Sequence, residues 1–309
     1  MKGDDSMSKK MIRTFALVAS ALAFVCTSAY AQGEVWKKEN AGVEMKAGEF
    51  KLILAPELFK GSRIDGYSAA WNRVAKVATS LGWKAETEDD LTKGKLDENK
   101  RVFSYPDTPD RVLNAKYYTL RHRVGMKASG ELNTEKADLT LKYSAKDGKA
   151  IPVEAFLKGL PEGTKAKAEV NVYGYVDKQI GKNVEHATMS VTFKKQPLLT
   201  GKETAAWFAQ KYPIINTLGI PAETVVNMPT SKYVITYATN VGKLKRGDTE
   251  FEVESCAWYN KDTGKFVTAE VSWRAKAKDA DASYELLNAI QRQASEILDA
   301  GKSKNAYIK

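Results

Sequence analysis

The sequence predicts an α+β protein in which a large antiparallel β-sheet or closed barrel is flanked by helices. Several segments alternate strictly between polar and apolar residues, as strands do when successive side chains leave opposite faces. Other segments carry apolar residues at helical spacing. With 309 residues, 43% of them hydrophobic and 10% aromatic, the chain can bury a core, which excludes a disordered or low-complexity protein.

About nine segments have the pattern of strands, which suits a large antiparallel sheet or a closed barrel. Their polar faces have two possible explanations: they face solvent, or they point into a barrel whose apolar outer faces are covered by helices. The pattern alone does not choose between them. The segments are Lys51–Leu54, Val102–Tyr105, Tyr117–Val124, Asp138–Tyr143, Lys167–Tyr173, Thr188–Lys194, Lys232–Tyr237, Glu250–Glu254 and Val267–Arg274.

Three segments are predicted to be helices that could cover such a sheet. One spans Ser68–Leu81 and is ended by Gly82. A second is predicted to begin at Thr200-Gly201-Lys202-Glu203, which has the form of a capping box. The third spans about Ala282–Ala300 and carries one apolar stripe. The dipeptide Asp65-Gly66 is interpreted as a turn signal.

The first 31 residues are predicted to be a secretory signal peptide. Basic residues precede an apolar run of 11 residues, Phe15–Val25, and Ala29-Tyr30-Ala31 supplies a cleavage pattern. The run is short of the roughly 20 residues that a transmembrane helix needs, so no transmembrane anchor is expected. We therefore expect an exported, periplasmic or secreted protein whose residues 32–309 form a single domain, since no repeat or linker divides them.

Composition narrows the chemistry. The formal charge of +10, about +8 after cleavage, favours anionic partners. With only two cysteines and two histidines, the composition excludes a zinc site and Cys-His catalysis. Cys256 would be the one cysteine left after removal of the signal peptide. His122 projects to the apolar side of its strand and His186 lies in a polar, turn-like stretch, so neither is a probable base. Export argues against a nucleic-acid partner for aromatic residues such as Trp258 and Trp273.

One motif resembles a known family. Tyr105-Pro106-Asp107-Thr108-Pro109-Asp110, followed by Leu113 and then Leu120-Arg121-His122-Arg123, resembles the CYTH superfamily of triphosphate tunnel proteins. Leu139-Thr140-Leu141-Lys142 is similar to the Thr-Leu-Lys strand of that family, and Phe266–Val271 with the last helix is similar to its closing elements. The resemblance implies an eight-stranded antiparallel tunnel in which basic side chains hold a polyphosphate and acidic ones hold Mg²⁺ or Mn²⁺.

The basic half of such a site is present. Arg121 and Arg123 are two residues apart on one strand, so both guanidinium groups leave the same face and could bind successive phosphates. Lys142 would add a third charge from a neighbouring strand. Together with Lys167, these are the predicted phosphate-binding residues.

The acidic half is depleted. The Glu-x-Glu pairs that the resemblance implies become Glu49-Phe50-Lys51, Glu169-Val170-Asn171 and Glu270-Val271-Ser272, so each has lost one member. Hard divalent cations need several oxygen ligands. Glu252 and Glu254 could supply the missing oxygens, or they could be ordinary solvated positions of a strand. The candidate metal ligands are therefore Glu49, Glu169, Glu252, Glu254 and Glu270, with no catalytic residue assigned.

Three functions remain open. The first is an exported protein that binds a polyanion, such as polyphosphate, triphosphate or a phosphorylated metabolite, with catalysis weak or absent. The second is an active metal-dependent triphosphatase that uses Glu169, Glu252, Glu254 and Glu270. The third is an envelope scaffold or carrier, which an extended apolar lining of the tunnel would favour.

Overall fold

The structure, a computed structural model, describes residues 36, 44–145, 150–226 and 233–299. The predicted signal peptide therefore lies outside the described residues, as do Lys232 and the predicted end of the last helix at Ala300. The strands are β1 (Ala47–Leu54), β2 (Lys84–Thr87), β3 (Asn99–Ser104), β4 (Tyr118–Met126), β5 (Leu132–Ser144), β6 (Ala166–Tyr173), β7 (Val184–Lys194), β8 (Val234–Arg246), β9 (Thr249–Asn260) and β10 (Phe266–Lys276).

The helices lie mainly between and after these strands. The α-helices are α3 (Arg63–Ser80), α4 (Asp89–Thr92), α5 (Val112–Ala115), α6 (Val153–Leu157), α7 (Ala205–Ala209) and α8 (Ala280–Gln293). Short 3₁₀ helices span Pro56–Phe59, Val176–Lys178, Pro213–Thr217, Ala277–Asp279 and Ser295–Ile297.

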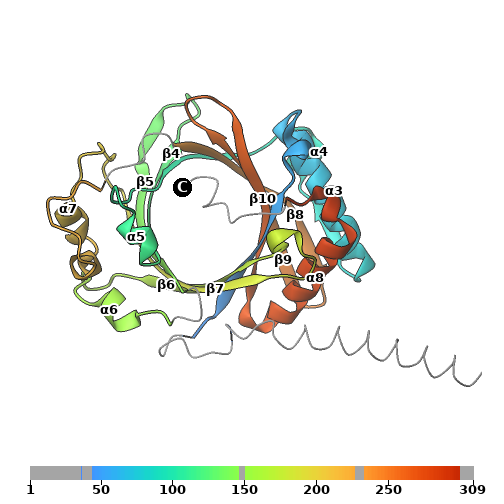
Figure 1. Ribbon diagram of the computed structural model, residues 1–309. Coiled ribbons are helices and arrows are strands. Elements are labelled where there is room, and N and C mark those ends of the chain that lie inside the picture. The colour runs from blue at the N-terminus through green and yellow to red at the C-terminus, as the bar shows by residue number, and fades with distance from the viewer. Residues whose placement is uncertain (1–35, 37–43, 146–149, 227–232, 300–309) are drawn as a thin grey trace, which may run out of the picture.

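Within the described part of the chain, nine strands close into a barrel (Figure 1). Around the barrel the order is β8-β3-β4-β5-β7-β6-β1-β10-β9, and β9 pairs with β8 to complete the ring. The short strand β2 pairs with the far end of β8 and extends the sheet outside the ring. These nine strands correspond to the nine segments that the alternation predicts, whereas the exposed β2 lacks that pattern.

The expectation of eight strictly antiparallel strands is wrong. The barrel has nine strands, and β1 runs parallel to β6, with Glu49 opposite Asn171, while the other pairs are antiparallel. Side-chain alternation looks the same in both kinds of pair, so the sequence pattern cannot distinguish them.

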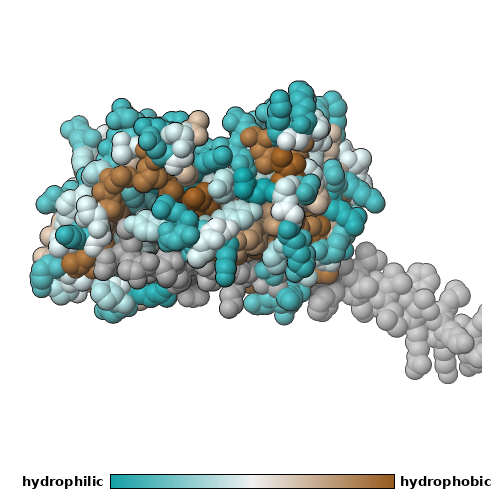
Figure 2. All heavy atoms as spheres, turned by 90° about the horizontal axis from the view of Figure 1, so that it is seen from above, coloured by the Kyte–Doolittle hydropathy of each residue, from teal (hydrophilic) through white to brown (hydrophobic). Residues whose placement is uncertain are grey.

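The apolar core lies outside the barrel, between its outer wall and the helices. Helices α3 and α8 cover one side, where Tyr67, Trp71, Leu286 and Ile290 are buried, and α6 and α7 lie on the opposite side (Figure 1). On the face shown in Figure 2, hydrophilic residues are interspersed with smaller groups of hydrophobic ones. Because the helices cover the apolar outer faces, the polar faces point inward, and the barrel alternative of the sequence is the correct one.

Helix α3 begins five residues before its predicted start. Its N-cap is Ser62, whose hydroxyl accepts from the Asp65 N–H while the Asp65 carboxylate accepts from the Ser62 N–H. Asp65 and Gly66 are therefore in the first turn of a helix, and the prediction of a turn there is wrong. Aspartate can take the place of glutamate in a capping box, which is why the helix start was missed.

The other two helix predictions also need correction. The Glu203 carboxylate accepts from the N–H groups of Thr200 and Gly201, but this arrangement closes a loop. Helix α7 begins later, capped by the Thr204 hydroxyl. Helix α8 ends at Gln293, and the chain continues in a 3₁₀ turn. None of the helices in the described residues is long and apolar enough to cross a membrane.

Candidate functional site

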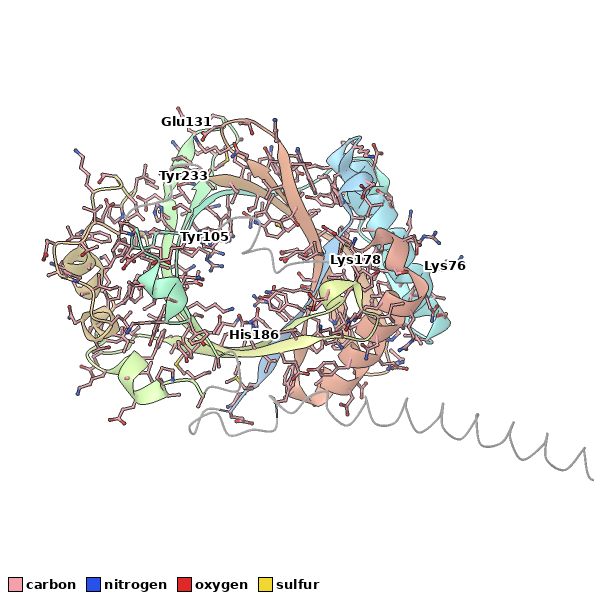
Figure 3. All side chains as sticks on the ribbon, viewed as in Figure 1. Lys76, Tyr105, Glu131, Lys178, His186 and Tyr233 are labelled. Atoms are coloured by element: carbon pink, nitrogen blue, oxygen red, sulfur yellow. The ribbon has the colours of Figure 1, made fainter. Side chains whose placement is uncertain are left out.

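The barrel encloses a cavity of about 450 Å³ to which all nine of its strands contribute inward-facing side chains. Nitrogen- and oxygen-bearing side chains reach into the central opening, and the labelled Tyr105 and His186 lie at its wall (Figure 3). Seven of the lining residues are basic and four are acidic, a formal excess of three positive charges. They are Lys51, Arg101, Arg121, Arg123, Lys142, Lys167 and Arg274, with Glu49, Glu169, Glu254 and Glu270.

Arg121 lies at the centre of this charge. Its Nε atom is buried and makes no hydrogen bond within the described residues, and its guanidinium lies 5.7 Å from the centre of the Phe103 ring. Burial, together with the neighbouring Arg123, lowers the pKa of Arg121. A buried guanidinium nitrogen without a hydrogen-bond partner is costly, and an anionic ligand is the kind of group that would relieve that cost.

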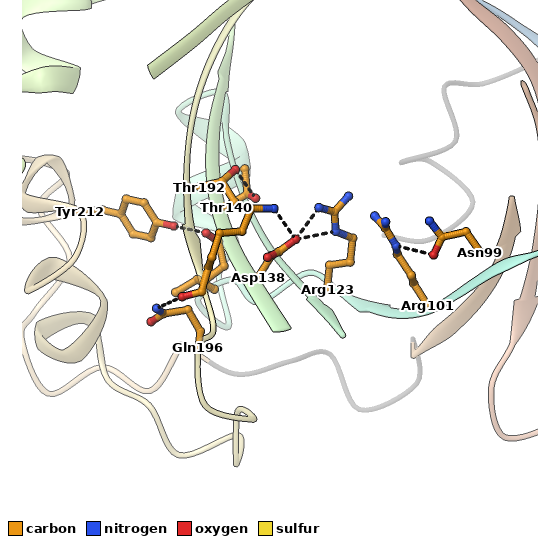
Figure 4. A network of polar contacts seen from close by, with 10 residues as sticks. Asn99, Arg101, Arg123, Asp138, Thr140, Thr192, Gln196 and Tyr212 are labelled. Carbon is orange, nitrogen blue, oxygen red and sulfur yellow. Dashed lines mark hydrogen bonds and ion pairs between the residues drawn. The ribbon is translucent and has the colours of Figure 1, made fainter. Parts of the chain in front are cut away.

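Arg123 and Arg101 add further positive charge to the tunnel lining, and Figure 4 shows the polar contacts around them. The guanidinium of Arg123 binds Asp138, which also lies 3.0 Å from the Lys194 ammonium, whereas Arg101 donates to Asn99. Arg121 and Arg123 both line the cavity and therefore share one face, as predicted, but of the two only Arg123 forms an ion pair among the described side chains. The sequence did not single out Arg101, although the alternation Asn99, Arg101, Phe103, Tyr105 would have revealed it had the strand been started three residues earlier.

Lys142 and Lys167 meet at one carboxylate. The Glu169 carboxylate lies 2.5 Å from the Lys167 ammonium and 3.4 Å from that of Lys142. Burial lowers the pKa of Lys142 to about 8, although Glu169 opposes this change. Burial would raise the pKa of Glu169, but the two lysines outweigh it and lower that pKa to about 2. Glu169 is therefore ionised and neutralises part of the basic cluster.

Lys51 is a tunnel residue that the sequence analysis did not predict as part of the site. In the sequence it stands only where a second glutamate is expected, yet its side chain is only 4% exposed and faces the tunnel. Its ammonium lies 2.5 Å from the Glu49 carboxylate and donates to Asn171 Oδ1 at 2.7 Å. The second partner is 120 positions away in sequence and was not predictable from spacing.

The five predicted metal ligands are not brought into one cluster. Glu169 and Glu270 are buried, Glu49 is half-buried, and Glu252 and Glu254 are exposed on β9. Among the residues that the structure describes, no three His, Cys, Asp or Glu side chains are arranged to hold a metal ion. Glu49 and Glu169, moreover, are already paired with lysines. The donor set does not fit Mg²⁺ or Mn²⁺.

The two histidines differ in position. His122 is buried on the outer face of β4, as the sequence predicts, and burial lowers its pKa. His186 lies in strand β7, opposite Asn171, with its ring 5.7 Å from that of Tyr173. The interpretation of its surroundings as turn-like is therefore wrong: the residue is part of the barrel wall.

The fold and the site together define an α+β barrel with a charged, predominantly basic tunnel. No protein-family profile and no curated protein sequence matches the chain. Solved structures do match it. A candidate adenylyl cyclase from Hippeastrum, described as having a dominant triphosphatase activity, is 11% identical with a TM-score of 0.43, over 85% of this chain and 95% of that one.

Two bacterial proteins give further matches. A candidate adenylate cyclase from Bacillus halodurans is 10% identical with a TM-score of 0.38, over 86% of this chain and 100% of that one. One from Vibrio parahaemolyticus is 9% identical with a TM-score of 0.31, over 84% and 97%. All three are structural likenesses at low sequence identity.

Proposed function

We propose that the tunnel binds a polyanion of the polyphosphate, triphosphate or phosphorylated-metabolite class. The observation that carries this proposal is the buried Arg121 Nε without a hydrogen-bond partner in the described structure, in a cavity that Arg123 and Lys142 also line. Guanidinium groups are suited to bidentate contacts with phosphate oxygens. Several linked phosphates would match a row of cations on adjacent strands better than a single one.

Calorimetric titration with tripolyphosphate tests the proposal. We expect saturable binding to the wild-type protein and a loss of at least about a hundredfold in Arg121→Ala/Arg123→Ala, since each lost charged contact weakens binding by roughly tenfold or more. The matched control is Arg73→Ala/Arg292→Ala, which removes two exposed arginines from the outer helices. No heat of binding for the wild type, or equal affinity in the two double variants, would contradict it.

Catalysis is proposed to be weak or absent, because the carboxylates do not form a metal-binding set. Phosphate release from tripolyphosphate with Mg²⁺ or Mn²⁺ measures this directly, and rapid turnover would favour the metal-dependent triphosphatase instead.

The carrier alternative depends on an extended apolar lining. The lining side chains are instead mainly charged or polar, which favours an anion over an amphiphile.

Export remains part of the proposal. It rests on the charged and apolar pattern before Ala31, in residues outside the described structure. Expression in a bacterial host, followed by fractionation and N-terminal sequencing, is expected to give a periplasmic protein that begins at Gln32. An uncleaved protein in the cytoplasmic fraction would contradict this prediction.

A further inference from the structure

Three neighbouring strands of the tunnel share one arrangement of side chains. Strands β6, β1 and β10 each carry a glutamate that lines the cavity: Glu169, Glu49 and Glu270. Two residues after the glutamate, each of these strands carries a residue that is not acidic: Asn171, Lys51 and Ser272. Because the side-chain period of a strand is two, each pair belongs to one face.

Of the three residues that are not acidic, Lys51 lies on the middle strand, between Asn171 and Ser272. Lys51 is opposite Ser272 in the pairing of β1 with β10, and its Nζ atom donates to Asn171 on β6. The same Nζ atom is 2.5 Å from Glu49 Oε2. A positive charge that is covalently part of the chain therefore already lies on the side of the tunnel where the acidic residues are concentrated.

A divalent cation at this wall would meet three obstacles. It would need several oxygen ligands at about 2.0 to 2.6 Å, but the Glu49 oxygen is held by Lys51. Glu169 is held by Lys142 and Lys167. The Lys51 ammonium would also repel the ion across a poorly screened, buried site, since this side chain is only 4% exposed.

We infer that the Lys51 ammonium takes the place of a divalent cation in this tunnel, so that the protein binds its polyanion without a metal. The inference rests on the proposed function and specifies how that binding occurs. Lys51 neutralises Glu49, which would otherwise repel an anion, and Lys142 and Lys167 do the same for Glu169. The remaining arginines then contact the ligand.

The decisive experiment uses the wild-type protein. Tripolyphosphate is titrated into metal-stripped protein in buffer with EDTA, and again with Mg²⁺ after correction for Mg²⁺-tripolyphosphate complexes. We expect the two affinities to agree within about twofold, because no ligand set has to be filled by a metal. In parallel, Mn²⁺ alone, followed by electron paramagnetic resonance, is expected to show no saturable binding.

Variants at position 51 test whether Lys51 is the residue that makes tripolyphosphate binding independent of a metal. Lys51→Met is expected to weaken tripolyphosphate binding in EDTA by about tenfold or more, because Glu49 is left without its neutralising partner. Lys51→Glu is expected to gain saturable Mn²⁺ binding, since a second carboxylate joins Glu49. The controls are Lys76→Met and Lys76→Glu on the exposed face of α3, and thermal melting verifies that every variant is folded.

The outcomes separate this inference from the proposed function. Tripolyphosphate binding that requires Mg²⁺, or saturable Mn²⁺ binding to the wild type, overturns the inference and leaves polyanion binding intact. An absence of tripolyphosphate binding under both conditions overturns the proposed function itself. A folded Lys51→Glu protein that gains no Mn²⁺ binding shows that Lys51 is not what excludes the metal.

Discussion

The Lys142 ammonium lies 3.4 Å from the Glu169 carboxylate, although strand β7 separates their strands in the barrel wall. The contact spans the concave inner surface, from β5 to β6, rather than one strand pair. The curvature of the barrel wall, seen in Figure 1, is therefore what brings these charges together. Burial lowers the pKa of Lys142 to about 8, closer to neutral pH than that of an ordinary lysine, although the contact with Glu169 opposes this change.

Anion binding is expected to weaken above pH 8 through Lys142. A bound anion favours the ammonium form, which is fully present below the pKa of about 8 and lost as the pH rises through it. The affinity of the wild type for tripolyphosphate, divided by that of Lys142→Arg, should fall about three- to tenfold between pH 7 and pH 9. The arginine variant stays charged and cancels the titration of tripolyphosphate itself. A constant ratio in calorimetry would rule out Lys142 as the titrating group.

Removing the Glu169 carboxylate should raise affinity and lower stability. In Glu169→Gln, Lys142 and Lys167 lose their shared counter-charge, so tripolyphosphate is expected to bind about three- to tenfold more tightly. The ligand-free protein should melt several degrees lower, as buried like charges are left uncompensated. Calorimetry and thermal melting check both effects against Glu162→Gln on an exposed loop. Weaker binding in Glu169→Gln would mean that the carboxylate supports the ligand.

Local alternation accounts for what the sequence predicted well. The inward positions of Arg121, Arg123 and Lys142 follow from the period of two, once helices are available to cover the outer faces. The same pattern gave the nine strands of the barrel. It could not give the parallel pairing of β1 with β6, which depends on contacts between segments more than 100 residues apart.

The polar contacts between charged residues could not be predicted either, because their partners are also far apart in the sequence. Lys51 and Asn171 read as two separate losses of a carboxylate, whereas in the fold they are hydrogen-bond partners. The predicted helix starts were wrong for a local reason instead. The helices are capped at Ser62 and Thr204, but nearby residues, Asp65-Gly66 and Thr200, favour turns or alternative caps equally well in the sequence.

Gly242 is expected to tolerate no side chain. A Cβ atom at this position, beside the irregularity in the pairing of β8 with β9, would lie 2.2 Å from the Trp71 ring and 2.6 Å from the Glu86 carbonyl oxygen. Gly242→Ala should therefore lower the free energy of unfolding by about 2 to 3 kcal/mol, the usual cost of overpacking a core. Denaturant unfolding measures the change. In a Trp71→Phe background the cost should shrink but not vanish, because the carbonyl contact remains; an unchanged stability would show that α3 shifts freely.

Asp138 is expected to stabilise the tunnel in a pH-dependent way. Burial alone would raise its pKa, but hydrogen bonds from Arg123 and Lys194 outweigh burial and hold the pKa below its ordinary value. A carboxyl whose pKa is lower in the folded state contributes stability above its ordinary pKa and loses it as the pH falls through the folded value. At pH 7 the free energy of unfolding of the wild type should therefore be about 1 to 3 kcal/mol higher than that of Asp138→Asn, since the variant leaves Arg123 without its carboxylate partner.

That difference should close as the pH falls through the lowered pKa of Asp138, because the carboxyl of the wild type then becomes protonated and neutral. Urea unfolding of both proteins across the acid range measures it. The control is Asp89→Asn, because Asp89 forms an ion pair with Lys93 but its side chain is 87% exposed, and exposed pairs of this kind contribute little. A stability difference between wild type and Asp138→Asn that does not shrink as the pH falls through the acid range would assign the role of Asp138 to packing rather than to its charge.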